Sequence, residues 1–305
     1  MIGTETTVAR EIELTAPAAD GVALAGTLTL PTGPGPHPAV LCLPGSGKLD
    51  RDSNAGRLRM DLGRPLAATL ARHGIASLRY DRRGVGATPG DWHTVGFLDN
   101  RADAAAALQA LRAHPQVRSV GVLGHSEGAV HAMWLAAHVP TAAAVLLAGY
   151  ARPGEAAVRW QGGRLAAAMP RLVRPLLPVL RRAASKQLAR VSATTTDAAR
   201  IGGVRVNAKW WREQLAYDPR ADLSRVRVPV LAITGEKDAQ VDPGDLDVIA
   251  KLVPGAQVRR VPDLTHLLRR TDGAGTVFGY RGLLRRPVED DLLEGVARWL
   301  ADRLR

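Results

Sequence analysis

The sequence predicts an α/β fold, in which a mainly parallel β-sheet carries helices on both faces. Short apolar segments alternate with helical segments along most of the chain. The apolar segments are continuous, as expected for strands buried on both faces. The chain has 305 residues, of which 46% are hydrophobic and 23% charged, so it can form one large globular domain with an insertion.

The first part of the chain is predicted to be β-structure. Residues 11–14 alternate at period two, and residues 22–30 do so again after the turn residues Asp20-Gly21. A loop rich in proline and glycine follows over residues 31–38. The third strand, 39–43, is short and apolar, and it leads directly into a glycine-rich turn.

Helices and strands then alternate as far as Tyr150. Gly74 stands where a C-cap glycine belongs, and Pro115 ends the second helix. The predicted helices cover residues 62–73, 98–114 and 129–138, and the predicted strands cover 75–80, 119–123 and 142–148.

The alternation is interrupted after Tyr150 and resumes with a strand over 228–233. The interval has helical periodicity, contains several prolines and shows no good strand. After it come a helix over 243–253, a strand over 257–261 and a final amphipathic helix over 289–304. We therefore predict a sheet domain formed by residues 1–150 and 217–305, with a helical cap over 151–216 inserted after the sixth strand.

The basic character of the chain is concentrated in this predicted cap. The formal net charge is +12, and residues 152–200 hold ten Arg or Lys against two acids, a net of +8. Such a surface permits weak contact with a membrane, although a solvated basic lid over an apolar acyl pocket is the preferred interpretation. No nucleic-acid partner is expected, because no recognisable module or aromatic platform is present. The sequence does not predict an oligomeric state.

The sequence favours a cytoplasmic protein. Cys42 is the only cysteine, so no intramolecular disulfide can form, and its apolar surroundings predict an inert buried thiol. Residues 1–14 lack the pattern of a signal peptide. Residues 128–151 carry no acidic or basic charge apart from histidine, but Pro140 interrupts them, so we interpret them as helix, break and strand.

The motif that carries the chemistry is Gly124-His125-Ser126-Glu127-Gly128. It follows a predicted strand and precedes a predicted helix, which is the context of a G-x-S-x-G nucleophile elbow. The turn is sharp, so the flanking positions must lack a Cβ, and it exposes the Ser126 hydroxyl above the sheet. The helix N-terminus beneath favours developing negative charge.

A serine nucleophile needs a base and an acid that orients the base. His266 is the only histidine after residue 138, and it follows the strand 257–261. Asp238 is the preferred acid, because it follows the strand 228–233 at the end where strands meet a crevice. Asp242 and, less favoured, Glu236 remain alternatives in the same loop.

The oxyanion hole requires two backbone N–H groups. The candidates are Glu127, directly after the nucleophile, and Ser46 in the turn after the third strand. The same turn lacks the glycine spacing of a phosphate-binding loop, and it lacks a Ser or Thr after Lys48. No metal is expected, since the sequence shows no ligand cluster.

With these residues placed, most of the chain resembles the α/β-hydrolase family, in a branch of serine esterases and acyl-esterases with prolyl-oligopeptidase-like bacterial relatives. The turn at 78–86, the segment Asp218-Pro219 before the strand 228–233 and the C-terminal helix are similar to that family. The resemblance implies a triad of Ser126, Asp238 and His266, no cofactor, and a helical lid. Leu43-Pro44 stands where many members have His-Gly.

The expected reaction is hydrolysis of a carboxylic ester of a small or acyl-chain substrate through an acyl-serine. An acyl-CoA thioesterase would suit the basic cap, and a small peptidase could use the same triad. A non-catalytic binding protein with this fold is the alternative from another class.

Overall fold

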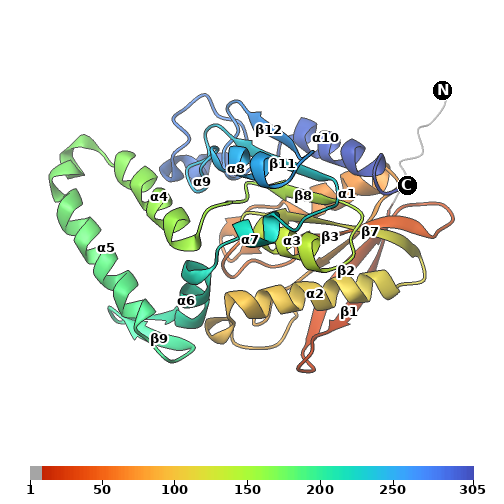
Figure 1. The fold of residues 1–305 in the computed structure, drawn as a ribbon, viewed down its shortest axis with the longest axis horizontal. Helices are drawn as coiled ribbons and strands as arrows, with labels where there is room; N and C mark the ends of the chain where they lie inside the picture. Colours follow the sequence, from red (N-terminus) through yellow and green to blue (C-terminus); the bar gives the residue numbers. More distant parts are fainter. Residues whose placement is uncertain (1–8) are drawn as a thin grey trace.

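A computed structural model describes residues 9–305, and an eight-stranded sheet forms its centre (Figure 1). The strand order is β1-β2-β6-β3-β7-β8-β11-β12. β1 pairs antiparallel with β2, β2 pairs antiparallel with β6, and the other neighbours are parallel. The strands are β1 (Arg10–Pro17), β2 (Ala23–Leu30), β3 (His37–Leu43), β6 (Ala76–Tyr80), β7 (Val117–His125), β8 (Ala144–Leu147), β11 (Val230–Gly235) and β12 (Gln257–Val261).

Helices cover both faces of the sheet, as the ribbon shows (Figure 1). On one face lie α2 (Phe97–Ala113), α3 (Glu127–His138) and α8 (Asp245–Leu252), whose apolar side chains belong to one buried cluster. On the other lie α1 (Gly63–Arg72) and α10 (Asp290–Ala301), which form a second cluster with the opposite side of the same strands. This layering confirms the predicted mainly parallel α/β architecture.

The sheet strands and the helices of the core follow the sequence prediction closely. All eight predicted strands are present, and their ends differ from the prediction by a few residues at most. Gly74 has a φ of +72°, so it ends α1 in the left-handed conformation expected of a C-cap glycine. These elements were predictable because each has its own apolar periodicity and its own terminating glycine or proline.

The segment between β8 and β11 differs from the prediction, because it contains strands. A two-stranded hairpin, β9 (Ala198–Ile201) and β10 (Val204–Asn207), lies near its end. Its turn is Gly202-Gly203, with φ values of +60° and +81°, which suits the primed turns that join hairpin strands. The strands were missed because each is only four residues long and their side chains do not enter the sheet core.

Helices form the rest of this segment and extend it away from the sheet (Figure 1). The elements are α4 (Gly154–Ala167), the 3-10 helix η2 (Arg171–Leu176), α5 (Leu177–Ser192) and α6 (Ala208–Ala216). α5 lies farthest from the sheet and is exposed along most of its length, with Val191 its buried residue. α6 returns the chain to the core, where it packs against α2.

Short elements absent from the prediction complete the described chain. They are β4 (Asn54–Ala55), β5 (Leu58–Arg59), η1 (Trp92–Thr94), α7 (Arg220–Leu223), η3 (Val277–Gly279) and α9 (Tyr280–Leu283).

Candidate active site

Ser126 lies at a strained turn between β7 and α3. Its φ of +55° and ψ of −119° are unfavourable for a residue with a side chain. A Cβ at Gly124 would lie 2.0 Å from the Gly128 carbonyl oxygen, and a Cβ at Gly128 would lie 2.2 Å from the Leu43 carbonyl oxygen. Glycine is therefore required on both sides of the serine, as the motif predicts.

The structure brings Ser126, His266 and Asp238 together. His266 Nε2 lies 3.1 Å from Ser126 Oγ, and His266 Nδ1 lies 2.8 Å from Asp238 Oδ2. The histidine and the aspartate are buried, while the serine is partly exposed. This geometry matches a nucleophile, a base and an orienting acid in one hydrogen-bonded chain.

Asp238 is held in place by the loop that follows β11. Its second oxygen, Oδ1, accepts hydrogen bonds from the backbone N–H groups of Gln240 and Val241 at 2.7 Å and 2.8 Å. The alternatives lie elsewhere: Asp242 forms an ion pair with Arg152 at 2.6 Å, and Glu236 is exposed. Of the three acids weighed from the sequence, Asp238 is the one that contacts His266.

The loop that carries His266 is fixed by a buried arginine. Arg269 is 3% exposed, and its guanidinium donates to the carbonyl oxygens of Met60, Leu267 and Arg286 at 2.7 to 2.9 Å. These three bonds tie the loop to the chain before α1 and to the chain before α10. Sequence reasoning gave Arg269 no role, since its partners are all backbone atoms.

A second histidine, His125, supports the site without competing as a base. Its Nε2 donates to the His266 carbonyl oxygen at 2.9 Å. Burial lowers the pKa of His125 to about 3, so the ring stays neutral near neutral pH. The two imidazole centroids are 4.9 Å apart, so His125 also packs against the triad histidine.

The predicted oxyanion donors flank Ser126. Glu127 begins α3 directly after the nucleophile. A Cβ at Gly45 would lie 3.4 Å from Ser126 Cβ, so the turn containing Ser46 passes close to the elbow. Ser46 itself is exposed.

The side chain of Glu127 forms a buried polar cluster that sequence reasoning missed. It is 4% exposed, and it pairs with Arg82 at 3.0 Å and with His131 at 3.1 Å. The Trp210 indole N–H, from α6, donates to its other oxygen at 3.0 Å. Although burial opposes it, the neighbouring Arg82 charge and the His131 hydrogen bond lower the pKa of Glu127 to about 2.

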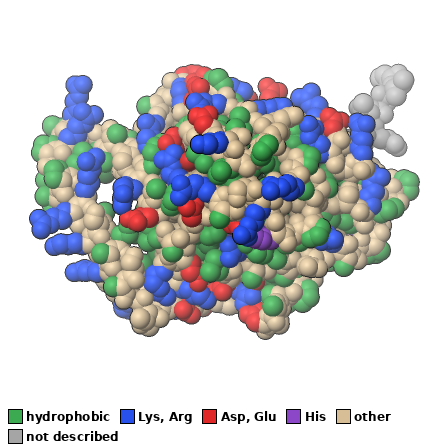
Figure 2. Space-filling view, viewed as in Figure 1, with side chains coloured by type: hydrophobic (Ala, Val, Ile, Leu, Met, Phe, Trp, Pro, Cys, Tyr) green, Lys and Arg blue, Asp and Glu red, His purple; other side chains and the backbone are tan. Residues whose placement is uncertain are grey.

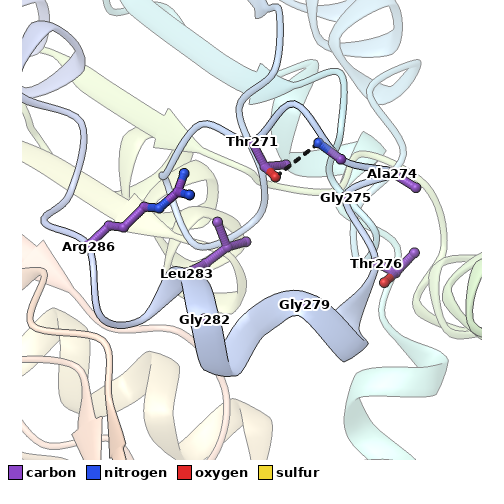
Figure 3. A pocket seen from close by; sticks show the side chains of 9 residues that line it. Thr271, Ala274, Gly275, Thr276, Gly279, Gly282, Leu283 and Arg286 are labelled. Atoms are coloured by element: carbon purple, nitrogen blue, oxygen red, sulfur yellow. Dashed lines mark hydrogen bonds between the residues drawn. The ribbon is translucent and has the colours of Figure 1, made fainter.

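Two cavities adjoin each other around residues 274–276. One, of about 220 Å³, is lined by residues 271–286, among them Thr271, Leu283 and Arg286 (Figure 3). The other, of about 160 Å³, lies between α4 and residues 274–277 and includes Ala239, next to the acid. Ser126, His266 and Asp238 line neither cavity, and Ser126 itself is partly exposed.

Three further features of residues 9–305 concern metal ligands, the single cysteine and membrane-spanning helices. Within this range, no group of three or more His, Cys, Asp or Glu side chains could hold a metal ion. Burial raises the pKa of Cys42 to about 12, which makes it a poor nucleophile. In the same residues, no helix is both long and apolar enough to cross a membrane.

The chain is similar to known proteins that are described as esterases. The chain is 28% identical over 281 residues to the esterase EstD of Thermotoga maritima, covering 91% of this chain and 65% of EstD, so it spans about two thirds of that relative's length. Among solved structures, Est1E of Butyrivibrio proteoclasticus with bound ferulic acid aligns with a TM-score of 0.63 and 15% identity, covering 95% of this chain and 98% of that one. The esterase Pf2001 of Pyrococcus furiosus aligns with a TM-score of 0.63 and 16% identity, covering 100% and 97%.

The structural likenesses confirm the α/β-hydrolase fold that the sequence resemblance implied. A family model described as "Serine aminopeptidase, S33" matches residues 61–270, which include the elbow, the loop of Asp238 and His266. The chain belongs to this serine aminopeptidase S33 family of α/β-hydrolases.

Proposed function

We propose that this chain is a serine hydrolase that cleaves carboxylic esters through an acyl-serine intermediate. The observation that carries the proposal is the chain of hydrogen bonds from Ser126 Oγ through His266 to Asp238, at 3.1 Å and 2.8 Å. The similarity to an esterase from Thermotoga maritima supports an ester over other acyl substrates. Est1E of Butyrivibrio proteoclasticus, whose structure holds ferulic acid, has the same fold.

In the proposed reaction, Ser126 Oγ attacks the ester carbonyl carbon while His266 Nε2 takes its proton. His266 then returns a proton to the leaving alkoxide, and the alcohol departs. A water molecule, deprotonated by the same nitrogen, attacks the acyl-serine and releases the carboxylic acid. Asp238 keeps the Nδ1 proton in place and stabilises the imidazolium that forms in each half-reaction.

The tetrahedral intermediates need two donors at the developing oxyanion. We assign these to the backbone N–H groups of Glu127 and Ser46. The position of Glu127 at the start of α3 supports the first, because a helix N-terminus presents free N–H groups to an anion. The close approach of Gly45 to Ser126 supports the second.

The substrate is proposed to bind between the core and a cap made of residues 151–216, with 1–150 and 217–305 forming the core. α4 and α6 of this cap lie beside the sheet, between it and α5 (Figure 1), and Trp210 of α6 donates to Glu127, the residue after Ser126. The cavity of about 160 Å³ between α4 and residues 274–277 includes Ala239, which follows Asp238, although Ser126 does not line it.

Two enzyme alternatives share the triad. The family description favours a peptidase, and the basic cap favours an acyl-CoA thioesterase, whose substrate carries phosphates that arginines bind well. A non-catalytic binding protein would not need the ordered contacts of His266 and Asp238. We prefer the esterase, since the relative and the neighbouring structures carry that description.

The outer part of the cap is proposed to contact anionic lipid. Leu172, Leu176 and Val179 are 94%, 57% and 67% exposed, which is unusual for large apolar side chains gathered within eight residues. Residues 156–196 hold eight Arg or Lys and no acid. Figure 2 shows these cations gathered on the projecting arm.

An anionic bilayer fits this surface better than a second copy of the chain does. No ion pair within residues 9–305 neutralises the six cations of η2 and α5, which are Arg171, Arg174, Arg181, Arg182, Lys186 and Arg190. Two such arms packed together would bring like charges into contact. Anionic lipid headgroups would instead attract the cations, and the exposed leucines could insert below the headgroups.

Vesicle co-sedimentation tests this contact. The protein should bind phosphatidylglycerol-containing vesicles more strongly as their anionic fraction rises, and Leu172→Glu should weaken the binding. Leu58→Glu, at an exposed leucine outside the cap, is the matched control. Vesicle binding that does not depend on the anionic lipid fraction, or equal binding by both variants, would contradict the assignment.

A cytoplasmic location is proposed for the enzyme. The support is the single buried cysteine, which cannot form an intramolecular disulfide.

The ester hydrolase assignment is tested by hydrolysis of p-nitrophenyl esters from acetate to palmitate. Wild type should hydrolyse part of the series, and Ser126→Ala should reduce that activity by several orders of magnitude. The chain length that is preferred then reports the depth of the acyl site. If no ester is hydrolysed while acyl-CoA substrates are, the thioesterase alternative replaces the esterase.

A further inference from the structure

Glu127 combines two features, a backbone N–H next to the nucleophile and a buried, charged side chain. Its backbone N–H is one of the two proposed oxyanion donors, while its side chain is buried, since the residue is 4% exposed. The carboxylate remains ionised near neutral pH, because Arg82 and His131 hold its pKa far below the usual range. A buried charge of this kind needs every partner in place, since each lost donor leaves it poorly solvated.

Arg82 connects Glu127 to the other half of the oxyanion hole. The same guanidinium nitrogen, Nη2, lies 3.0 Å from Glu127 Oε1 and donates to the Pro44 carbonyl oxygen at 3.0 Å. Pro44 begins the turn that carries Ser46. Arg82 is 4% exposed, so one buried cation ties the glycine-rich turn to the residue after the nucleophile.

Trp210 connects Glu127 to the cap. It lies in α6, and its indole N–H donates to Glu127 Oε2 at 3.0 Å. Asn207, the N-cap of α6, donates from its side-chain amide to the carbonyl oxygens of Trp92 and Val95, both at 2.7 Å. α6 also contacts the start of α2, through Lys209 with Asp99 and through Glu213 with the Leu98 N–H. It is therefore fixed to the core at several places, and Trp210 is the one that reaches the nucleophile elbow.

We propose that Glu127 is a positioning residue that joins the cap, through Trp210, to both donors of the oxyanion hole. Seating α6 on the core then helps to set the Glu127 N–H and, through Arg82, the turn of Ser46. The inference rests on the proposed function. It predicts that loss of the Trp210 contact slows acyl transfer even for a substrate too small to need the cap, because oxyanion donors act only at 2.7–3.1 Å.

The chain supplies a matched control for this contact. Trp211 lies beside Trp210 in α6, with ring centroids 5.0 Å apart, and both are partly buried. No hydrogen bond within residues 9–305 uses the Trp211 indole N–H. Trp210→Phe and Trp211→Phe therefore remove the same atoms from the same helix, but only the first removes a donor to Glu127.

The experiment compares both variants with wild type on p-nitrophenyl acetate and with phenylboronic acid. Boron bonds to Ser126 Oγ while His266 Nε2 takes the hydroxyl proton, and the resulting tetrahedral boronate anion places a boron hydroxyl in the oxyanion hole. Trp210→Phe should lower kcat/KM and weaken boronate binding by about tenfold each, as expected for a weakened oxyanion donor. Trp211→Phe should change both by less than about twofold.

Urea unfolding of both variants separates positioning from general stability. Equal kcat/KM and equal boronate affinity in the two variants would overturn the inference. If the lower kcat/KM of Trp210→Phe is fully explained by a larger fraction of unfolded protein, the inference is overturned as well. A wild type that hydrolyses no ester would contradict the proposed function itself, which distinguishes that failure from the other two.

Discussion

The buried charge of Glu127 makes a quantitative prediction about acid stability. The pKa of Glu127 is lowered from 4.5 to about 2, a difference that corresponds to about 3 kcal/mol of folding free energy at neutral pH. Because the pKa is depressed on folding, this stability is fully present well above pH 4.5 and is lost as the pH falls toward 2. About 2 kcal/mol of it should be gone at pH 3.

Glu127→Gln tests this value. The variant leaves Arg82, which is 4% exposed, without its buried counter-charge, so it should lower the free energy of unfolding at pH 7 by about 3–5 kcal/mol. At pH 3 wild type has lost most of the same interaction, and the difference between the two proteins should shrink by about 2 kcal/mol.

Urea unfolding of both proteins at pH 7, 5, 4 and 3 measures this difference. Glu155→Gln is the control, because Glu155 pairs with Arg159 at 2.6 Å on an exposed surface, where an ion pair contributes less than about 1 kcal/mol. A Glu127→Gln penalty that stays constant from pH 7 to pH 3 would refute the reasoning. So would a penalty no larger than that of the control.

Three further predictions concern the site and its surroundings. Asp238→Asn places an amide donor against His266 Nδ1 and selects the wrong tautomer, so kcat for p-nitrophenyl acetate should fall by roughly 10³–10⁴-fold; a loss below tenfold would exclude Asp238 as the orienting acid. Gly128→Ala puts a Cβ 2.2 Å from the Leu43 carbonyl oxygen and should lower the melting temperature strongly, whereas Gly162→Ala, in open space on α4, should leave it equal or higher. Cys42, whose pKa is raised to about 12 by burial, should not react with a thiol reagent at pH 8 until urea unfolds the protein.

The core and the nucleophile were predictable because their signals are local. Ser126 is marked by two glycines that its strained turn requires, and the strand and helix on either side have clear periodicities of their own. His266 followed from chain order, as the one histidine after residue 138.

The choice of acid needed the structure. Asp238 and Asp242 are four residues apart in one loop, so spacing does not separate them. The fold separates them by their partners: Arg152, from the segment after β8, engages Asp242, while two backbone N–H groups hold Asp238 toward His266.

Most of the polar cluster around Glu127 could not be predicted from local patterns. Arg82 and Trp210 come from a turn and from α6, which are distant from Glu127 in sequence, while His131 lies four residues after it on the same helix. The local signals were a carboxylate placed directly after the nucleophile and a histidine at i+4 from it. The hairpin β9–β10 was missed for a different reason, because strands of four residues outside the sheet carry too little periodicity.

The central claim is that Ser126 is an activated nucleophile, and covalent labelling tests it most directly. A fluorophosphonate probe should add one adduct to the intact wild-type protein, and peptide mapping should place it on Ser126. Ser126→Ala should remain unlabelled, while Ser185→Ala, at an exposed serine of α5, should label like wild type. An adduct on another residue, or equal labelling of Ser126→Ala, would contradict the account.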